Sequence, residues 1–319
     1  MGNKNIVVDQ ELAPDWQKEF AEFFKKFSKQ KSDLDRQVLL GWEHPGKGIT
    51  LEQFQLFLEH REAFGVSNWL LPFLLQELKC HLLFFGREFD LVPFTETLKH
   101  YGLKHIQAWQ KLGLEPHFLP DALMIPELEF PGWKIQPEEW LYTQTNKGKI
   151  FRLQNGGLVV DTSTFRLEGV AVLIDTRPKP AYTGGDQMYE NDNFLGPIIE
   201  RLRASGSIQD YTPRSSRFNV SSEEWEKVKP EVARLLGLEL TQVRLERTIE
   251  GNVIPQLYPQ MPRKDDGTTN TWEWREEFFA SRSSRLFGGY SGYGGLAGVG
   301  YRVVGYRWRN QAVRSLAVL

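Results

Sequence analysis

The chain has almost no cysteine, and its histidines are confined to one part of it. Cys80 is the single cysteine among 319 residues, so no disulfide can form within the chain. All six histidines lie within the first 117 residues, and the last 202 residues contain neither histidine nor cysteine. Because these residue types supply most zinc ligands and the usual catalytic bases and thiol nucleophiles, that long part cannot hold a zinc centre, a histidine triad or a cysteine nucleophile. The first part shows no HExxH or CxxC spacing, and we expect no metal site and no cofactor.

Long apolar runs and a strong net charge are also missing. The most apolar stretch, from Trp69 to Phe85, contains a proline, a glutamine and three ionisable residues, whose cost in hydrocarbon favours a buried helix over a membrane span. Residues 1–11 are too polar and acidic to form a secretory signal. The formal charge of −2 provides no general attraction to nucleic acid or to anionic membranes. We therefore expect a cytoplasmic protein without a membrane span.

Apolar residues recur with a helical period over much of the first 112 residues. They predict helices over about 14–27, over 50–58, over 68–78 and over about 103–112. Thr50 and Gln53 have the spacing of a capping box at the second of these, and Gly113 ends the last. The aromatic stripes on these helices are interpreted as core packing, because no polar group recurs among them. Residues 1–115 are predicted to form an all-helical module.

The pattern changes after this module. Five prolines fall within residues 116–137, where a helix cannot persist, and residues 116–149 are interpreted as a proline-rich connection. Beyond it, the sequence predicts strands over 158–160, 170–174 and 243–247, and helices over 193–204 and from Ser221 or Ser222 to Leu236. The predicted fold class is therefore α+β, with a helical module followed by an α+β domain over residues 150–319.

The last 42 residues, which follow Glu277, have no acidic residue and no lysine, but they have six arginines. Eight of the 18 residues from Gly288 to Gly305 are glycine, and three tyrosines lie among them. The chain then ends in the apolar run 316–319, which has to be buried, so this glycine-rich segment is expected to lie inside a fold rather than in a linker. Tyrosine and arginine are also residue types that binding surfaces favour.

Several stretches of the sequence resemble a known family. They are residues 285–291 (RLFGGYS), 294–297 (GGLA) and 313–319 (VRSLAVL), and upstream 189–197 and 252–259. They resemble the formylglycine-generating-enzyme type of C-type lectin fold, and in particular the variable proteins of diversity-generating retroelements. The resemblance covers about residues 150–319 and does not extend to residues 1–115. The chain departs from the family pattern at Phe287, where the family has arginine, at Val313, where it has phenylalanine, and after Arg314, where no proline follows.

The resemblance implies a C-type-lectin-like ligand-binding domain rather than an enzyme. The enzyme branch of the family uses a pair of active-site cysteines, and this chain has none beyond Cys80. A branch of the family with an iron site is not supported either, because residues 150–319 contain no histidine that could be a ligand. The oxygen-rich run 190–193 could serve a calcium ion, but a helix-capping turn is the simpler interpretation of it. We therefore expect no catalytic residues and no bound metal.

The resemblance also implies a diversified binding patch within a variable region at about residues 285–314. Adenine-directed mutagenesis of AAY codons can produce 15 of the 17 residues from Gly298 to Arg314, the exceptions being Trp308 and Gln311. The candidate ligand-binding positions are Tyr290, Tyr293, Gly298, Gly300, Tyr301, Arg302, Val304, Tyr306, Arg309, Asn310 and Ala312. The candidate scaffold positions are Arg285, Gly288, Gly289, Gly294, Gly295, Trp308 and Arg314, with packing expected from Leu286, Leu296, Val299, Leu316 and Val318.

The leading functional prediction is a non-enzymatic protein that binds a protein ligand through this face. The alternative is a nucleic-acid-binding protein whose arginines neutralise phosphates and whose tyrosines stack on bases. A third interpretation is an enzyme using paired carboxylates such as Asp161 and Asp175, although these also suit the ends of two strands. A purely structural interpretation pairs Arg282 and Arg285 with the acidic residues at 273, 276 and 277.

Overall fold

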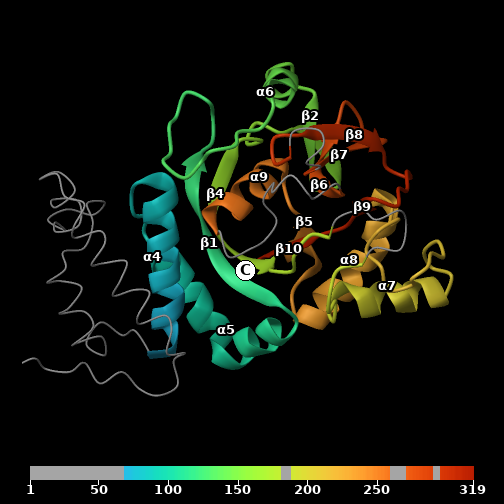
Figure 1. The fold of residues 1–319 in the computed structure, drawn as a ribbon, viewed down its shortest axis with the longest axis horizontal. Helices are drawn as coiled ribbons and strands as arrows, with labels where there is room; N and C mark the ends of the chain where they lie inside the picture. The colour runs from blue at the N-terminus through green and yellow to red at the C-terminus, as the bar shows by residue number, and fades with distance from the viewer. Residues whose placement is uncertain (1–67, 181–187, 259–270, 290–294) are drawn as a thin grey trace, which may run out of the picture. The chain divides into compact units, whose positions relative to one another are not determined.

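The computed structural model describes residues 68–180, 188–258, 271–289 and 295–319 (Figure 1). The chain divides into two compact units, one of residues 1–82 and 87–91 and one of residues 83–86 and 92–319. The helices predicted over 14–27 and 50–58 lie outside the described residues. Among the helices that are described, none is long and apolar enough to cross a membrane. The described part combines helices with antiparallel sheets, so the α+β class is confirmed.

The first unit is described only from the short helix η1 (Asn68–Leu70) onward. Helix α4 (Leu71–Phe85) follows, which confirms the helix predicted over 68–78 and extends it. Pro72 is tolerated because it lies in the first turn, where a backbone N–H has no helical acceptor. The helix ends before Gly86, whose φ of +69° suits a glycine that closes a helix.

The second unit begins with helix α5 (Val92–Lys111), which buries Phe94, Leu98, Ile106 and Trp109. Its second half is the helix predicted over 103–112. Gly102 has φ of 76° and ψ of 161° inside this element, so the backbone breaks there into two helical segments. Gly113 follows with φ of +72°, which confirms that a glycine ends the helix.

Strand β1 (Leu114–Leu123) corrects the prediction that residues 116–149 are a connection without regular structure. It pairs along its length with β4 (Arg166–Asp175), although it contains Pro116 and Pro120. A strand tolerates prolines where it has a neighbour on one side only, and β1 is the edge strand of its sheet. Helix α6 (Glu139–Asn146) also lies in the range that was predicted to be a connection.

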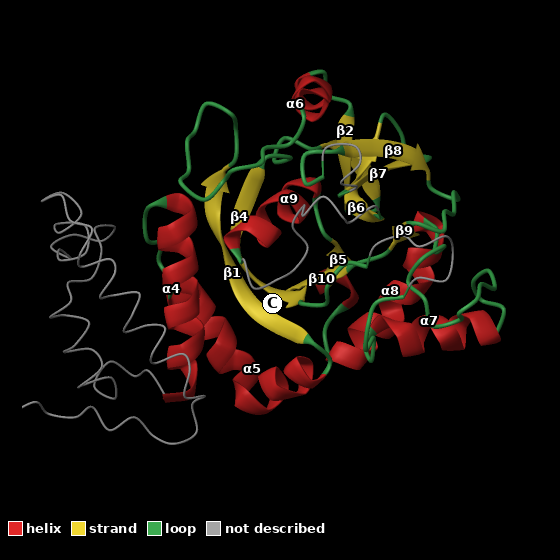
Figure 2. Cartoon of the chain, in the orientation of Figure 1, coloured by secondary structure: helices red, strands yellow, loops and turns green. Residues whose placement is uncertain are grey.

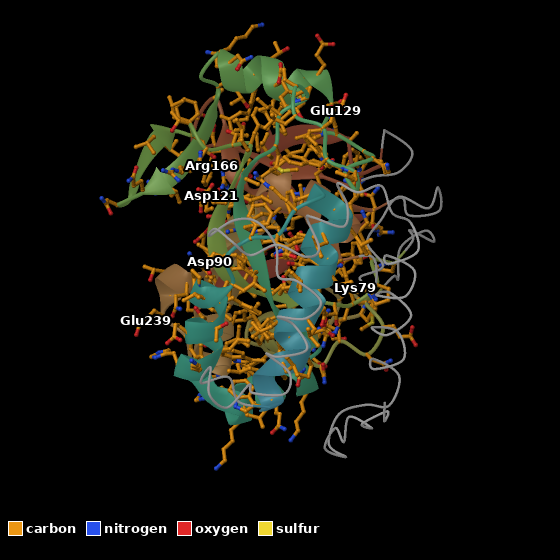
Figure 3. All side chains as sticks on the ribbon, turned by 90° about the vertical axis from the view of Figure 1, so that its left-hand side faces the viewer. Lys79, Asp90, Asp121, Glu129, Arg166 and Glu239 are labelled. Atoms are coloured by element: carbon orange, nitrogen blue, oxygen red, sulfur yellow. The ribbon has the colours of Figure 1, made fainter. Side chains whose placement is uncertain are left out.

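The first sheet has the strand order β1, β4, β10, β5, and all its pairings are antiparallel (Figures 1 and 2). The C-terminal strand β10 (Ser315–Val318) lies in its interior, between β4 and β5 (Val243–Leu245). This confirms the predicted strand at 170–174 and the first three residues of the one predicted at 243–247. Of the apolar run 316–319, Leu316 and Ala317 are buried and the last two residues are half-buried. At the surface of the sheet, Asp121 of β1 and Arg166 of β4 form an exposed ion pair with an N–O distance of 2.6 Å (Figure 3).

The second sheet carries the segment that the sequence singles out as a binding region. Its order is β3, β2, β6, β7, β8, and the short strand β9 pairs with β6 in parallel. Among the described strands, β8 pairs with β7 alone, so it is the edge strand of this sheet. The strands are β2 (Ile150–Gln154), β3 (Gly157–Val160), β6 (Trp272–Phe279), β7 (Ser284–Gly288), β8 (Val299–Val303) and β9 (Gln311–Ala312).

Three further helices complete the unit, and two of them were predicted. Helix α7 (Leu195–Ala204) and helix α8 (Ser222–Leu236) confirm the predicted ranges. Helix α9 (Thr248–Leu257), which contacts strands of both sheets, was not predicted. Ser221 caps α8 through a capping box with Glu224, which anchors the start of the helix where it meets the second sheet.

Candidate ligand-binding surface

Among the described residues of the predicted binding region, the exposed ones lie in one short stretch of chain, from Tyr301 on β8 to Arg309 in the loop after it. Four large apolar or aromatic side chains are exposed there, with relative exposures of 44% (Tyr301), 57% (Val303), 38% (Tyr306) and 37% (Trp308). Two arginines are exposed with them. We call this set the exposed patch, and it consists of Tyr301, Arg302, Val303, Tyr306, Trp308 and Arg309.

The structure separates the predicted ligand-binding positions into exposed and buried ones. Tyr301, Arg302, Tyr306 and Arg309 belong to the exposed patch, and Val304 is half-buried. Tyr290 and Tyr293 lie outside the described residues, as does the scaffold glycine Gly294. The remaining four predicted positions, Gly298, Gly300, Asn310 and Ala312, need correction.

These four positions do not present a side chain to solvent. Ala312 is fully buried against Tyr189 and Phe218, and Asn310 is 7% exposed. Gly298 is buried, and its carbonyl accepts a hydrogen bond from the N–H of Gly289. At Gly300, an added Cβ would lie 2.8 Å from the ring of Phe287, a separation that real contacts do not allow. Because β9 turns inward to pair with β6, the chain leaves the surface after Arg309.

Trp308 combines the predicted scaffold role with an exposed side chain. Its backbone carbonyl accepts hydrogen bonds from the N–H groups of Asn219 and Gln311, with N–O distances of 3.1 and 3.0 Å. Its indole is 37% exposed, so the side chain of this predicted scaffold residue also forms part of the exposed patch. Val303, which the prediction omitted, is the most exposed of the four apolar and aromatic side chains of the patch, at 57%. Its place on an edge strand is not visible in the sequence, because strand alternation alone does not tell which face is covered.

The predicted scaffold arginine Arg314 lies in the core behind the patch. It has no exposed surface, and its Nε donates to Oε1 of Glu273 at 2.7 Å. Its Nη1 donates to the backbone carbonyls of Asp175 and Arg177 at 3.0 and 3.1 Å. Burial alone would lower the pKa of this guanidinium, but Glu273 and the other acidic groups nearby outweigh it and raise the pKa. Arg314 thus joins the end of β4 in one sheet to β6 in the other.

Arg285, the other predicted scaffold arginine, is also buried, with 1% exposure. Its Nη2 donates to the carboxylate of Glu276 at 2.8 Å, and its Nη1 donates to Ser222 at 3.1 Å. Its guanidinium lies over the ring of Phe278, 4.7 Å from the centroid. This pairing agrees with the structural interpretation of Arg285. Arg282 differs, because it is exposed and donates to the carbonyl of Gly156 at 3.3 Å.

The two faces of β8 carry different side chains. On one face, Tyr301 stacks on Phe279 with ring centroids 4.2 Å apart, and Trp140 of α6 stacks on Tyr301 at 6.0 Å. On the other face, the guanidinium of Arg302 lies 5.3 Å from the ring centroid of Phe287. Cross-strand pairing places Arg302 opposite Arg285, and Gly300 opposite Phe287, so the second face carries arginines and aromatic rings side by side.

A pocket of about 510 Å³ adjoins this second face, a volume in the range of small-ligand sites. It lies between the start of α8 and the turn from β6 to β7, and it includes Val304, which directly follows β8. Its lining combines apolar, hydroxyl and charged side chains: Leu153, Phe278, Val304, Ser222, Ser283, Glu223, Glu226, Arg282 and Arg285.

The two carboxylates considered for catalysis are both ion-paired. Asp175 is fully buried and forms ion pairs with Arg177 and Arg217. Burial would raise the pKa of Asp175, but Arg217, Arg314 and Arg177 outweigh it and hold the pKa below its usual range. Asp161 is 1% exposed and pairs with Arg247 at 3.3 Å.

The oxygen-rich run 190–193 contains the helix-capping turn expected from the sequence. Oδ1 of Asp192 accepts hydrogen bonds from the N–H groups of Phe194 and Leu195, at 3.2 and 3.0 Å. The same carboxylate is ion-paired with Arg217, so its oxygens already have partners. Across the described ranges of the chain, no group of three His, Cys, Asp or Glu side chains has the arrangement that could hold a metal ion.

A scan against protein-family models and searches of curated proteins and of solved structures found no match to this chain.

Proposed function

We propose that this protein is a non-enzymatic binding protein whose exposed patch contacts a protein ligand. The observation that carries the proposal is the division of the C-terminal segment into an exposed stretch, 301–309, and a buried frame. Tyrosine, tryptophan and arginine contribute most of the energy in protein interfaces, and the patch has two tyrosines, one tryptophan and two arginines. The adjoining pocket offers space for one side chain of the ligand.

The same division supports a diversified surface, as the family resemblance implies. Substitutions at exposed positions change the free energy of unfolding little, whereas changes in a packed core are costly. Four of the candidate variable positions are exposed, and the frame behind them is held by buried hydrogen bonds of Arg285 and Arg314. The patch can therefore vary without loss of the fold. In this proposal residues 150–319, together with strand β1 that completes their first sheet, form a C-type-lectin-like domain that acts in the cytoplasm.

The placement of the arginines favours a protein ligand over a nucleic acid. Of the six arginines after Glu277, Arg285 and Arg314 are buried, and Arg307 pairs with Glu224 at 3.0 Å. The nearby acidic residues Glu223 and Glu226 line the pocket. A nucleic acid binds more tightly with each backbone phosphate that a cation of the protein neutralises. Few of these arginines are placed to neutralise a phosphate.

The proposal of a varied surface is tested by sequencing the 3′ end of the gene across a natural population. We expect substitutions to concentrate at codons 301, 302, 306 and 309 and to follow from changes at adenines. Codons 300, 310, 312 and 314 are expected to stay constant, because their side chains are buried or crowded. An invariant segment, or variation spread evenly over buried and exposed codons, would contradict the diversified surface.

The binding activity is tested on the full chain by display. A library randomised at Tyr301, Arg302, Tyr306 and Arg309 is selected against an immobilised test protein such as hen lysozyme. We expect folded binders whose affinity is nearly independent of salt between 50 and 500 mM, in contrast to the steep salt dependence of phosphate binding. A library that yields no binder, while a single-stranded oligonucleotide binds the parent chain and is released by salt, would favour the nucleic-acid alternative.

A further inference from the structure

Arg302 has surroundings unlike those of the three ion-paired arginines of the C-terminal segment. Arg285, Arg307 and Arg314 each form an ion pair with a glutamate. In the part of the chain that the structure describes, no carboxylate forms an ion pair with Arg302. Its one protein hydrogen bond there runs from Nη1 to the carbonyl of Tyr301, at 3.1 Å. The guanidinium therefore keeps most of its donors for solvent or for a ligand.

Aromatic rings hold this guanidinium in place. Its Cζ lies 5.3 Å from the ring centroid of Phe287 and 5.9 Å from those of Tyr306 and Trp308. These distances fall within the range of cation–π attraction. Phe287 is itself fixed, because Trp272 packs against it edge-on with centroids 4.6 Å apart. An arginine held in this way loses less side-chain freedom when it binds than one that is free to rotate.

The hydrogen-bond donors of Arg302 and its neighbours indicate which chemical group of a ligand they would bind. A guanidinium presents a planar pair of N–H groups that matches the two oxygens of a carboxylate. The indole of Trp308 and the hydroxyl of Tyr306 can supply further donors beside it. Glu223 and Glu226 line the neighbouring pocket, so a chain of phosphates would meet negative charge there. A single carboxylate on a protein side chain would not.

We propose that Arg302, braced by Phe287, Tyr306 and Trp308, binds an aspartate or glutamate side chain of the ligand. This inference deepens the proposed function and rests on it, since it names the chemical group that the exposed patch recognises. Arg302 is the specific anchor for a negative group, while the aromatic side chains around it exclude water and supply contact area. Arg234 on helix α8 is the comparison, because it is exposed, pairs with Glu231 at 3.0 Å and belongs neither to the exposed patch nor to the pocket lining.

The test uses peptides selected from a random library on the immobilised full-length chain. We expect the selected peptides to share an acidic residue and to bind Arg302→Lys about tenfold more weakly, because lysine keeps the charge but loses the planar pair of donors. Arg234→Lys is expected to change the affinity less than about twofold. Changing the shared acidic residue of the peptide to its amide is expected to weaken binding to the parent chain more than binding to Arg302→Lys.

The outcomes separate this inference from the proposed function. Peptides that are weakened by Tyr306→Ala and Trp308→Ala, but that lack an acidic residue and tolerate Arg302→Lys, would overturn the inference and leave the binding function intact. If no selected peptide depends on the patch, the proposed function fails. The carboxylate group is then tested alone, by titrating the chain with acetylated triglutamate and following the Nε–H resonance of Arg302. A saturable shift supports carboxylate binding by Arg302, and an unchanged resonance refutes it.

Discussion

Replacing Ala312 by asparagine tests whether the C-terminal segment is divided into core and surface as the structure indicates. Asparagine is reachable from the same codons as tyrosine or serine, so a diversified surface at this position would tolerate it. Ala312 has no exposed surface and packs against Tyr189 and Phe218. The added carboxamide has to push these rings apart, which costs about 1–3 kcal/mol. Its polar atoms also lose water without gaining partners, which costs about 1–3 kcal/mol more.

The matched change is Tyr306→Asn, which places the same side chain in the exposed patch. Tyr306 is 38% exposed, and its ring contacts Trp308 edge-on at 6.1 Å. Loss of this contact is expected to cost no more than about 1 kcal/mol. Urea unfolding followed by circular dichroism measures both variants against the parent chain. We expect Ala312→Asn to lower the free energy of unfolding by about 2–6 kcal/mol.

The comparison has a clear negative result. If the free energies of unfolding of Ala312→Asn and Tyr306→Asn differ by less than about 0.5 kcal/mol, the side chain at position 312 is not buried as the structure places it. The separation between a constant frame and an exposed patch would then be refuted, together with the expectation that codon 312 stays constant. A second pair, Gly300→Asn and Arg309→Asn, repeats the test on the strand itself, where the added Cβ at 300 meets Phe287.

Three further predictions concern the frame. Arg314→Met removes the closest cation from the buried carboxylate of Glu273, which then keeps Tyr189 and Arg275, and should lower the free energy of unfolding by about 3–5 kcal/mol. The double change with Glu273→Gln should recover part of the loss in the same denaturant titration. Burial raises the pKa of Glu277 from its ordinary 4.5 to about 7, against the opposing charge of Arg247, so the folded protein retains a proton that the unfolded chain releases. The stability that the protonated Glu277 carboxyl contributes is complete below pH 4.5. It should fall by about 3 kcal/mol as the pH rises to neutrality. If the stability of Glu277→Gln falls in the same way with pH, the assignment to Glu277 is contradicted. Ser221→Ala removes the cap of α8 and should cost about 1 kcal/mol, measured as a lower thermal midpoint, whereas an unchanged midpoint would mean that the cap contributes nothing.

Local sequence signals located several elements well. The helices α4, α7 and α8, the second half of α5, and the strands β4, β5 and β10 all follow from patterns within a few residues of each element. Ser221 and Gly237 mark the two ends of α8, because capping side chains and left-handed glycines act on their own turn of helix. Such signals need no distant partner, and they are therefore readable in a single sequence.

Other elements depend on partners that are far away in the chain. Strand β1 contains two prolines and becomes a strand only because it lies at the edge of the sheet beside β4. Helix α9 contains Pro255 and is almost wholly buried between the two sheets. Its Asn252 accepts a hydrogen bond from Trp133 at 2.8 Å and donates one to the carbonyl of Leu296. These contacts join residues more than 40 positions apart in sequence, where propensity is overridden by packing.

The sequence by itself determined the residue types available to the C-terminal segment: arginine, tyrosine and glycine, with no acid, no histidine and no cysteine. It also determined that the apolar end must be buried. Only the tertiary structure decided which of these residues face outward. Tyr301 and Arg302 lie exposed on the edge strand β8, whereas Ala312, ten residues beyond Arg302, is covered by Tyr189 and Phe218. Exposure depends on what packs above a residue, and those neighbours come from distant parts of the chain.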